Sequence, residues 1–224
     1  MITIHYEDSH LLIVEKPPGM PVQSDPTGDP DLLTILSDQI HHPLWLVHRL
    51  DRPVGGLIVY AKTKEACSRL STAWQEKRIQ KSYTAVVCGR PEKEEAECKH
   101  YIRKCKTINR SKIEATRVAY AKRAVLRYRV LDQTHSDEFG PLALLGIDLE
   151  TGRHHQIRVQ LSHIGLPIWG DTKYNKTFTK RKVWSQIALW STRLQFEHPM
   201  TKESIKISLS PNVEPYTFFQ GDHQ

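Results

Sequence analysis

The sequence predicts a mixed fold in which many short strands are combined with a few helices. Short apolar runs recur along the chain, as at Leu11–Val14 and Leu57–Ala61, and such runs are typical of buried strands. Between them, Lys64–Lys77 repeats its apolar residues at helical spacing. With 39% hydrophobic and 25% charged residues, the 224-residue chain has the composition of a globular protein long enough for one substantial core or two lobes.

The first part of the chain is predicted to form two strands, a loop and a short helix. Ile2–Tyr6 alternates apolar and polar residues like a strand, and three prolines close behind Leu11–Val14 end the strand there. Gln23–Pro30 is rich in Pro, Gly and Asp, which predicts a loop. Apolar residues recur through Asp31–His41 and predict a helix with one apolar face.

The elements further along follow the same patterns. Thr63 is the predicted N-cap of the helix Lys64–Lys77, whose apolar stripe is core packing. Gly152 is predicted to make a tight turn before a helix that runs to about Ile164 and ends at Gly165. The other predictions are strands at Ile79–Gly89, Lys122–Leu131 and Leu142–Leu149, a basic loop at Asn175–Arg181, and a closing hairpin of Leu194–Pro199 and Ile205–Leu209.

The chain carries an excess of positive charge. It has 32 Lys and Arg against 25 Asp and Glu, a net charge of +7 and a pI near 9.2. Cations are dense from Lys99 to Arg129, and Pro91–Ala115 is predicted to be an inserted surface hairpin or arm. Such a segment suits phosphate contact, although a solvated charged loop has the same composition. The charge therefore favours a polyanionic partner such as nucleic acid.

Two absences in the sequence bear on the compartment. No apolar run approaches the ~20 residues of a membrane span, and the N-terminus lacks the basic start and apolar core of a signal peptide. We therefore expect a cytoplasmic protein with no membrane partner. The four cysteines show no CxxC spacing, and disulfides are rare in a reducing compartment. A zinc site from Cys98, His100 and Cys105 is disfavoured because the spacing fits no structural zinc pattern.

Asp51 is the residue that the sequence singles out for chemistry. It lies among His48, Arg49 and Arg52, directly before the turn residues Pro53–Gly56 and an apolar run. Pro fixes φ and Gly permits positive φ, so the carboxylate is expected on a loop just before a core strand, where scaffolds often hold reactive groups. A turn aspartate in a surface ion pair would fit the local pattern equally well.

The stretch from His48 to Leu57 resembles the signature loop of the RluA-type pseudouridine synthases, whose usual form is His-Arg-Leu-Asp-x-x-Thr-Ser-Gly. Further stretches resemble the same family. They are the Lys-Pro-x-Gly segment at Lys16, Lys81-x-Tyr83-x-Ala85, the Thr-Gly-Arg-x-His-Gln-Ile-Arg pattern of Thr151–Arg158, the Gly-x-Pro-x-x-Gly-Asp-x-x-Tyr segment Gly165–Tyr174, and Gln186–Ser191. Two departures stand out, because Val54-Gly55 occupies the usual Thr-Ser position and Trp190-Ser191 the usual His-Ala position.

The resemblance implies an α+β pseudouridine synthase fold: a mixed, mostly antiparallel, bent sheet flanked by helices and loops, with a central basic cleft. It implies isomerisation of uridine in RNA to pseudouridine, without metal or organic cofactor. Residues 1–210 would form the catalytic domain, with a basic insertion at 91–115, and residues 211–224 a tail. Many relatives carry a small helical RNA-binding domain ahead of the first strand pair. The sequence leaves no room for one there, so we expect a stand-alone catalytic domain, and a monomer is the family default.

The resemblance also implies roles for individual residues. Asp51 carries over as the catalytic carboxylate, Tyr83 as the tyrosine whose ring stacks on the target base, and Arg158 as the cation that keeps Asp51 ionised. His154 and Arg158 are expected one helical turn apart on a shared face. The residues expected to contact the flipped-out substrate are His48, Arg49, Leu50, Arg52, Arg153, His154, Gln156 and Leu189.

Two other functions stay open on the sequence. A non-catalytic RNA-binding protein could keep the fold, although binding alone needs no carboxylate in a cationic loop. A carboxylate-based glycosidase usually needs a second carboxylate as general acid. The motif stretches offer only Glu150 and Asp171 for that role, and both have turn explanations. Because the resemblance implies an RNA-modifying enzyme, we expect structured ribosomal or transfer RNA as the partner.

Overall fold

The computed structural model describes residues 2–105, 107–181 and 185–219. The chain divides into two compact units. The first contains residues up to Lys81 together with Trp190–Pro211, and the second contains Ser82–Leu189 and the described residues from Asn212 onward. The single catalytic domain expected for residues 1–210 stays a prediction.

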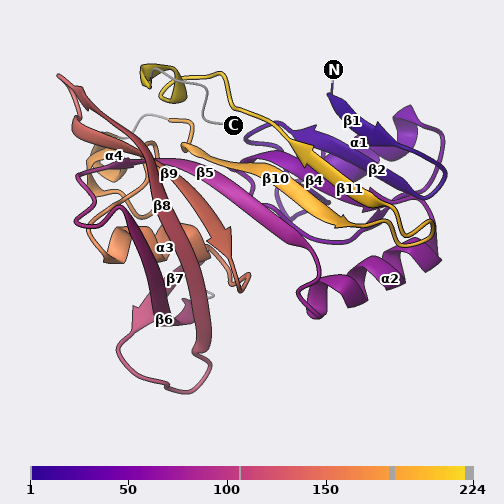
Figure 1. The fold of residues 1–224 in the computed structure, drawn as a ribbon, viewed down its shortest axis with the longest axis horizontal. Coiled ribbons are helices and arrows are strands. Elements are labelled where there is room, and N and C mark those ends of the chain that lie inside the picture. The colour runs from indigo at the N-terminus through magenta and orange to yellow at the C-terminus, as the bar shows by residue number, and fades with distance from the viewer. Residues whose placement is uncertain (1, 106, 182–184, 220–224) are drawn as a thin grey trace. The chain divides into compact units, whose positions relative to one another are not determined.

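The first unit is a layer of strands covered by helices (Figure 1). Strands β1 (Ile4–Glu7), β2 (Leu11–Lys16) and β4 (Gly55–Ala61) pair antiparallel in that order, and the two-residue β3 (Trp45–Leu46) also pairs with β4. Strand β10 (Leu189–Glu197) joins β4 in parallel, and β11 (Ser204–Ser208) forms the predicted hairpin with β10.

Strand β4 is buried along its whole length, because both of its faces are covered. Leu57 and Val59 pack with Leu70 of helix α2 (Lys64–Gln75). On the other face, Tyr60 donates a hydrogen bond to the carbonyl oxygen of Val22 at 3.0 Å. The apolar run after Asp51 therefore is the core strand that the sequence predicted.

The second unit is an antiparallel set of strands in the order β5 (Gln80–Cys88), β9 (Gly140–Leu149), β8 (Lys122–Ser136), β6 (Glu95–Cys105) and β7 (Arg110–Glu114). Strands β6 and β7 run as a hairpin beside the first half of β8 (Figure 1). Helix α3 (Gln156–His163) packs on this hairpin, where its Val159 contacts Ile102. The remaining helices are α4 (Lys176–Arg181) and the 3₁₀ turn Tyr216–Phe218.

The helices predicted in the first unit are confirmed. Helix α1 spans Leu32–Gln39 with Asp31 as its N-cap, which accepts from the Thr34 N–H at 3.0 Å. Helix α2 begins after Thr63, whose hydroxyl accepts from the Ala66 N–H at 3.1 Å. Side-chain oxygens at these positions satisfy N–H groups that have no partner inside the helix, which is why both helices begin there.

Two local predictions in the second unit are wrong. Residues 176–181 form helix α4 rather than a loop, because Asn175 accepts from the Thr177 N–H at 3.1 Å and Phe178 is buried. His154 does not share a helical face with Arg158. Helix α3 begins at Gln156, and His155 before it has a left-handed backbone with φ of 53°, so the chain turns before the helix starts.

The observed elements agree with the predicted α+β class, since nearly all strand pairs are antiparallel and the helices are few. Among residues 2–105, 107–181 and 185–219, no helix is long and apolar enough to cross a membrane.

The two departures from the family pattern meet where β4 and β10 pair. Trp190 lies opposite Gly55, and Ser191 opposite Gly56. A Cβ atom on Gly55 would lie 2.6 Å from the indole ring of Trp190, so the absent side chain makes room for the large ring. The indole Nε1 donates to a Glu15 carboxylate oxygen at 3.2 Å. The indole ring of Trp190 therefore fills the space left by the missing side chain of Gly55, and this packing supports β4, the strand that follows Asp51.

We expect the residues of this pair to depend on each other. Gly55→Ser should lower the free energy of unfolding by about 1–3 kcal/mol through overpacking, and Trp190→His by a similar amount through lost volume. The loss in the double variant should be smaller than the sum of the two single losses by about 1 kcal/mol or more, because the smaller ring vacates the space that the serine needs. Urea unfolding of the four proteins measures the coupling; strictly additive losses would contradict it.

Candidate active site

Asp51 is half-buried in the loop between β3 and β4. The loop turns back on itself, because the Val54 N–H donates to the Asp51 carbonyl oxygen at 2.9 Å. Val54 is buried behind this turn, and the glycines that follow lie against β10. The carboxylate is thus carried on a short, closed turn at the start of a buried strand.

Lys16 is the residue beside this loop whose role sequence reasoning missed. Its side chain is fully buried, and its ammonium group donates to the carbonyl oxygens of Pro17, Met20 and Arg52 at 2.9, 2.8 and 3.0 Å. Burial lowers the pKa of Lys16 to about 7, and the negative charge of Asp51 opposes that shift. The sequence signal for this buried role was a lysine two positions after Val14, on a strand whose apolar residues are buried.

Arg52 clamps a neighbouring loop instead of extending freely into solvent. Its Nε donates to the Gly19 carbonyl oxygen at 2.8 Å, its Nη1 donates to the Thr27 hydroxyl at 3.0 Å, and its Nη2 pairs with Asp29. The guanidinium therefore ties residues 19–29 to the Asp51 loop. Contact of Arg52 with RNA stays a prediction, and it would require competition with Asp29.

Two other residues of this loop point inward. His48 is 7% exposed, its Nε2 accepts from the Val59 N–H at 3.2 Å, and its ring stacks on Trp74 at 4.2 Å. Burial, with a smaller effect from Lys81, lowers the pKa of His48 to about 3, so the ring is neutral. Leu50 is also buried, whereas Arg49 is exposed. Burial argues against direct substrate contact by His48 and Leu50, and Arg49 is the loop cation that faces solvent.

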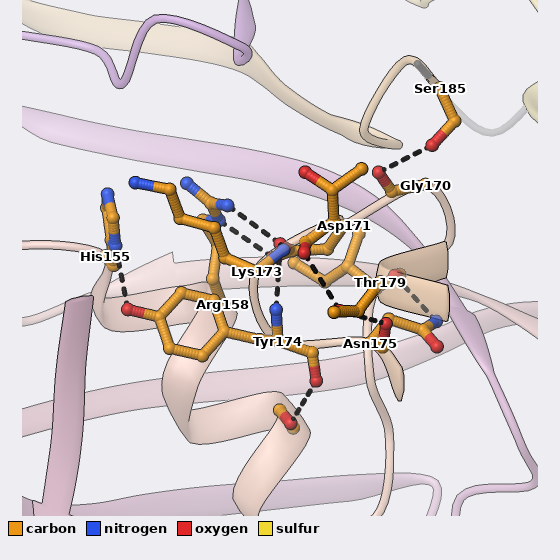
Figure 2. Close-up of polar contacts among 12 residues, drawn as sticks. His155, Arg158, Gly170, Asp171, Lys173, Tyr174, Asn175, Thr179 and Ser185 are labelled. Atoms are coloured by element: carbon orange, nitrogen blue, oxygen red, sulfur yellow. Dashed lines mark hydrogen bonds and ion pairs between the residues drawn. The ribbon is translucent and has the colours of Figure 1, made fainter. Parts of the chain in front are cut away.

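The second unit contains a buried ion pair (Figure 2). Arg158 on α3 donates from Nε and Nη2 to the two carboxylate oxygens of Asp171, both at 2.8 Å. The side chains are 3% and 0% exposed. The Tyr174 ring lies beneath the guanidinium, 5.3 Å from its central carbon. Sequence reasoning assigned Asp171 to a turn and therefore missed this partner of Arg158.

The hydroxyl group of Tyr174 links this pair to the β6–β7 hairpin. It accepts from the Ser111 N–H at 2.6 Å and lies 2.8 Å from Nδ1 of His155. Burial, together with the nearby charge of Arg158, lowers the pKa of His155 to about 2, so the ring is neutral and its Nδ1 can accept the hydroxyl proton. His154 joins the same network, because its carbonyl oxygen accepts from the Ser111 hydroxyl at 2.7 Å.

The remaining predicted residues of the second unit differ in exposure. Tyr83 is buried on β5 opposite Ile147, and Leu189 is buried as well. Gln156 is also buried, and its amide donates to the Val125 carbonyl oxygen at 3.0 Å, so it holds the turn before α3. Arg153 donates from Nε to the Arg123 carbonyl oxygen at 3.0 Å.

The structure groups the predicted residues into two sets. Asp51 belongs to the first unit with Lys16 and Arg52, whereas Tyr83 and Arg158 belong to the second. Joint action of Asp51, Tyr83 and Arg158 stays a prediction. In the part of the chain that the structure describes, no group of three or more His, Cys, Asp or Glu could hold a metal ion.

Comparison with known structures identifies the fold. Human RNA pseudouridylate synthase domain containing 1 superposes with a TM-score of 0.80 over 94% of this chain and 84% of that chain, at 22% identity. The fold is therefore that of a pseudouridylate synthase domain, as the sequence predicted.

Sequence comparison identifies the family. The family model described as RNA pseudouridylate synthase matches residues 10–163. The tRNA pseudouridine synthase C of Haemophilus influenzae is 30% identical over 93% of this chain and 92% of its own length. The ribosomal large subunit pseudouridine synthase D of Pseudomonas aeruginosa is 32% identical over 92% of this chain and 67% of its own length. The chain belongs to the RNA pseudouridylate synthase family and is an RNA isomerase.

The neutral, buried His48 should make the protein sensitive to mild acid. The unfolded chain protonates this histidine near pH 6.5, whereas the folded protein resists protonation down to about pH 3. The unfolded state therefore binds more protons between these values, and the free energy of unfolding should fall by about 2 kcal/mol from pH 7.5 to pH 5 on account of this group.

Urea unfolding at the two pH values tests this expectation. His48→Gln should be less stable at pH 7.5 but should lose about 2 kcal/mol less than the unmodified protein on acidification, because glutamine does not titrate. His42→Gln changes an exposed histidine and is the matched control, which should retain the original pH dependence. An unchanged pH dependence in His48→Gln would contradict the assignment.

Proposed function

We propose that this protein isomerises specific uridines of transfer or ribosomal RNA to pseudouridine, with Asp51 as the catalytic carboxylate acting on a flipped-out nucleotide. The observation that carries the proposal is the position of Asp51. It lies in the family's signature loop, on a closed turn beside the buried cation Lys16. Membership of the family supplies the reaction class, and the names of the two relatives supply the two classes of RNA.

The chemistry needs few protein groups. The bond from ring nitrogen N1 to the anomeric carbon breaks, the uracil rotates, and C5 bonds to the same carbon. C5 then loses its proton and N1 takes up a proton, so the product is an isomer of uridine. Uracil is both leaving group and returning nucleophile, so no redox agent enters the balance. An ionised Asp51 would attack the anomeric carbon or remove the neighbouring sugar proton.

The second unit would supply the remaining groups. Arg158 would pair with Asp51 during the reaction, and the ring of Tyr83 would stack on the target base while its hydroxyl relays a proton. Turning a uridine out of its stack costs a few kcal/mol, which contacts to the RNA backbone must offset. Exposed Arg49 and the turn residues Arg153 and His154 are the candidates for those contacts.

Asp51→Asn tests the proposal, because asparagine keeps the shape but cannot act as a nucleophile or base. We expect pseudouridine formation to fall by at least about a thousandfold. Affinity for the same RNA should change by less than about threefold, since phosphate contacts provide most of it. The assay is tritium release from unmodified tRNA and large-subunit rRNA transcripts labelled at uracil C5, with filter binding for affinity.

Asp38→Asn, an exposed change on α1, is the matched control and should keep full activity. If Asp51→Asn still released tritium at the original rate, the assignment of the carboxylate would be wrong. If the unmodified protein bound both transcripts but released no tritium, the non-catalytic RNA-binding function would replace the proposal.

A further inference from the structure

We propose that Asp171 is a positioning residue of the reaction: its carboxylate, together with the ring of Tyr174, fixes the orientation of the Arg158 guanidinium. The inference rests on the proposed function, in which Arg158 acts on the catalytic carboxylate. It concerns a residue whose sequence context indicated only a turn, and the buried ion pair with Arg158 is what carries it (Figure 2).

The pairing geometry restricts the guanidinium in two directions. Nε and Nη2 donate to different oxygens of one carboxylate, both at 2.8 Å. Two parallel hydrogen bonds allow neither sliding nor rotation within their common plane, so a bidentate pair has more geometric specificity than a single contact. Since both side chains are excluded from water, these bonds are also stronger than the same bonds at a surface.

Asp171 is itself held in place. One of its carboxylate oxygens also accepts from the N–H groups of Lys173 and Tyr174, at 2.8 and 3.1 Å. Gly170 before it has φ of 77°, and a Cβ atom there would lie 2.1 Å from the Gln186 carbonyl oxygen. The backbone of its own turn thus fixes the Asp171 carboxylate. A long arginine side chain has many rotamers, so this fixed carboxylate is what orders the Arg158 guanidinium.

Tyr174 restricts the third direction. Its ring covers one face of the guanidinium, where a cation is attracted to the π electrons. The ring cannot tilt easily, because its hydroxyl is held by the Ser111 N–H and by His155. Carboxylate in the plane and ring on the face together define one orientation of Arg158.

Asp171→Asn tests the inference, because the amide offers only one acceptor and no charge. In single-turnover tritium release from the same C5-labelled transcripts, we expect the rate constant to fall by at least about a hundredfold, the effect of misplacing a reacting group by about 1 Å. The dissociation constant for the transcript should change by less than about threefold. Asp171→Glu keeps the charge and should recover part of the lost rate.

Asp8→Asn is the matched control for loss of stability. Asp8 is also a hydrogen-bonded carboxylate; it accepts from the Tyr6 hydroxyl and from the His10 N–H, outside the predicted site. This variant should unfold at a lower temperature and still react at the original rate. An Asp171→Asn protein that folds and reacts at the original rate would overturn the inference.

A milder pair of variants covers the case in which Asp171→Asn does not fold. Tyr174→Phe keeps the ring face, whereas Tyr174→Leu removes it, so the leucine variant should react at least about fivefold more slowly than the phenylalanine variant. Equal rates would overturn the inference. An active Asp51→Asn protein would instead overturn the proposed function, whatever the result at position 171.

Discussion

Burial of a cation is the constraint that organises both units. Lys16 and Arg158 are withdrawn from water, and an ionised group in a protein interior is tolerated only where fixed acceptors replace its hydration. The structure meets that requirement with three backbone carbonyl oxygens around Lys16 and with the Asp171 carboxylate on Arg158. The segments that provide these acceptors are therefore held in place, because each acceptor must stay within hydrogen-bond distance of its cation. In each unit the fixed segment contains a residue proposed to act on RNA.

Much of the fold could be predicted from local sequence because the decisive signals are local. Thr63 as a cap, the apolar stripe of α2 and the run Leu57–Ala61 each depend on neighbours within a few residues. Helix α4 could not be predicted in the same way. Its Phe178 stacks on Phe139, which is far away in the chain, and a six-residue helix has too few turns to show a period.

The candidate site shows the same division. Asp51 and Arg158 were predicted from their motifs, but the buried contacts of Lys16 and Asp171 were not. Lys16 and Asp171 act through contacts with residues 36 and 13 positions away, and neither contact leaves a spacing pattern in the chain. Arg52 was predicted to contact the substrate, and its engagement with Asp29 and a backbone carbonyl was not visible in the sequence.

The hairpin of β6 and β7 is attached near its turn to the segment before α3. Ser111 on β7 donates its hydroxyl proton to the His154 carbonyl oxygen and its N–H to Tyr174, and Ile102 on β6 packs against Val159. Separation of this turn from α3 would have to break two short polar contacts and an apolar contact at once. The turn of the hairpin and the helix that carries Arg158 are therefore tied together, so that a displacement of one must be accommodated by the other.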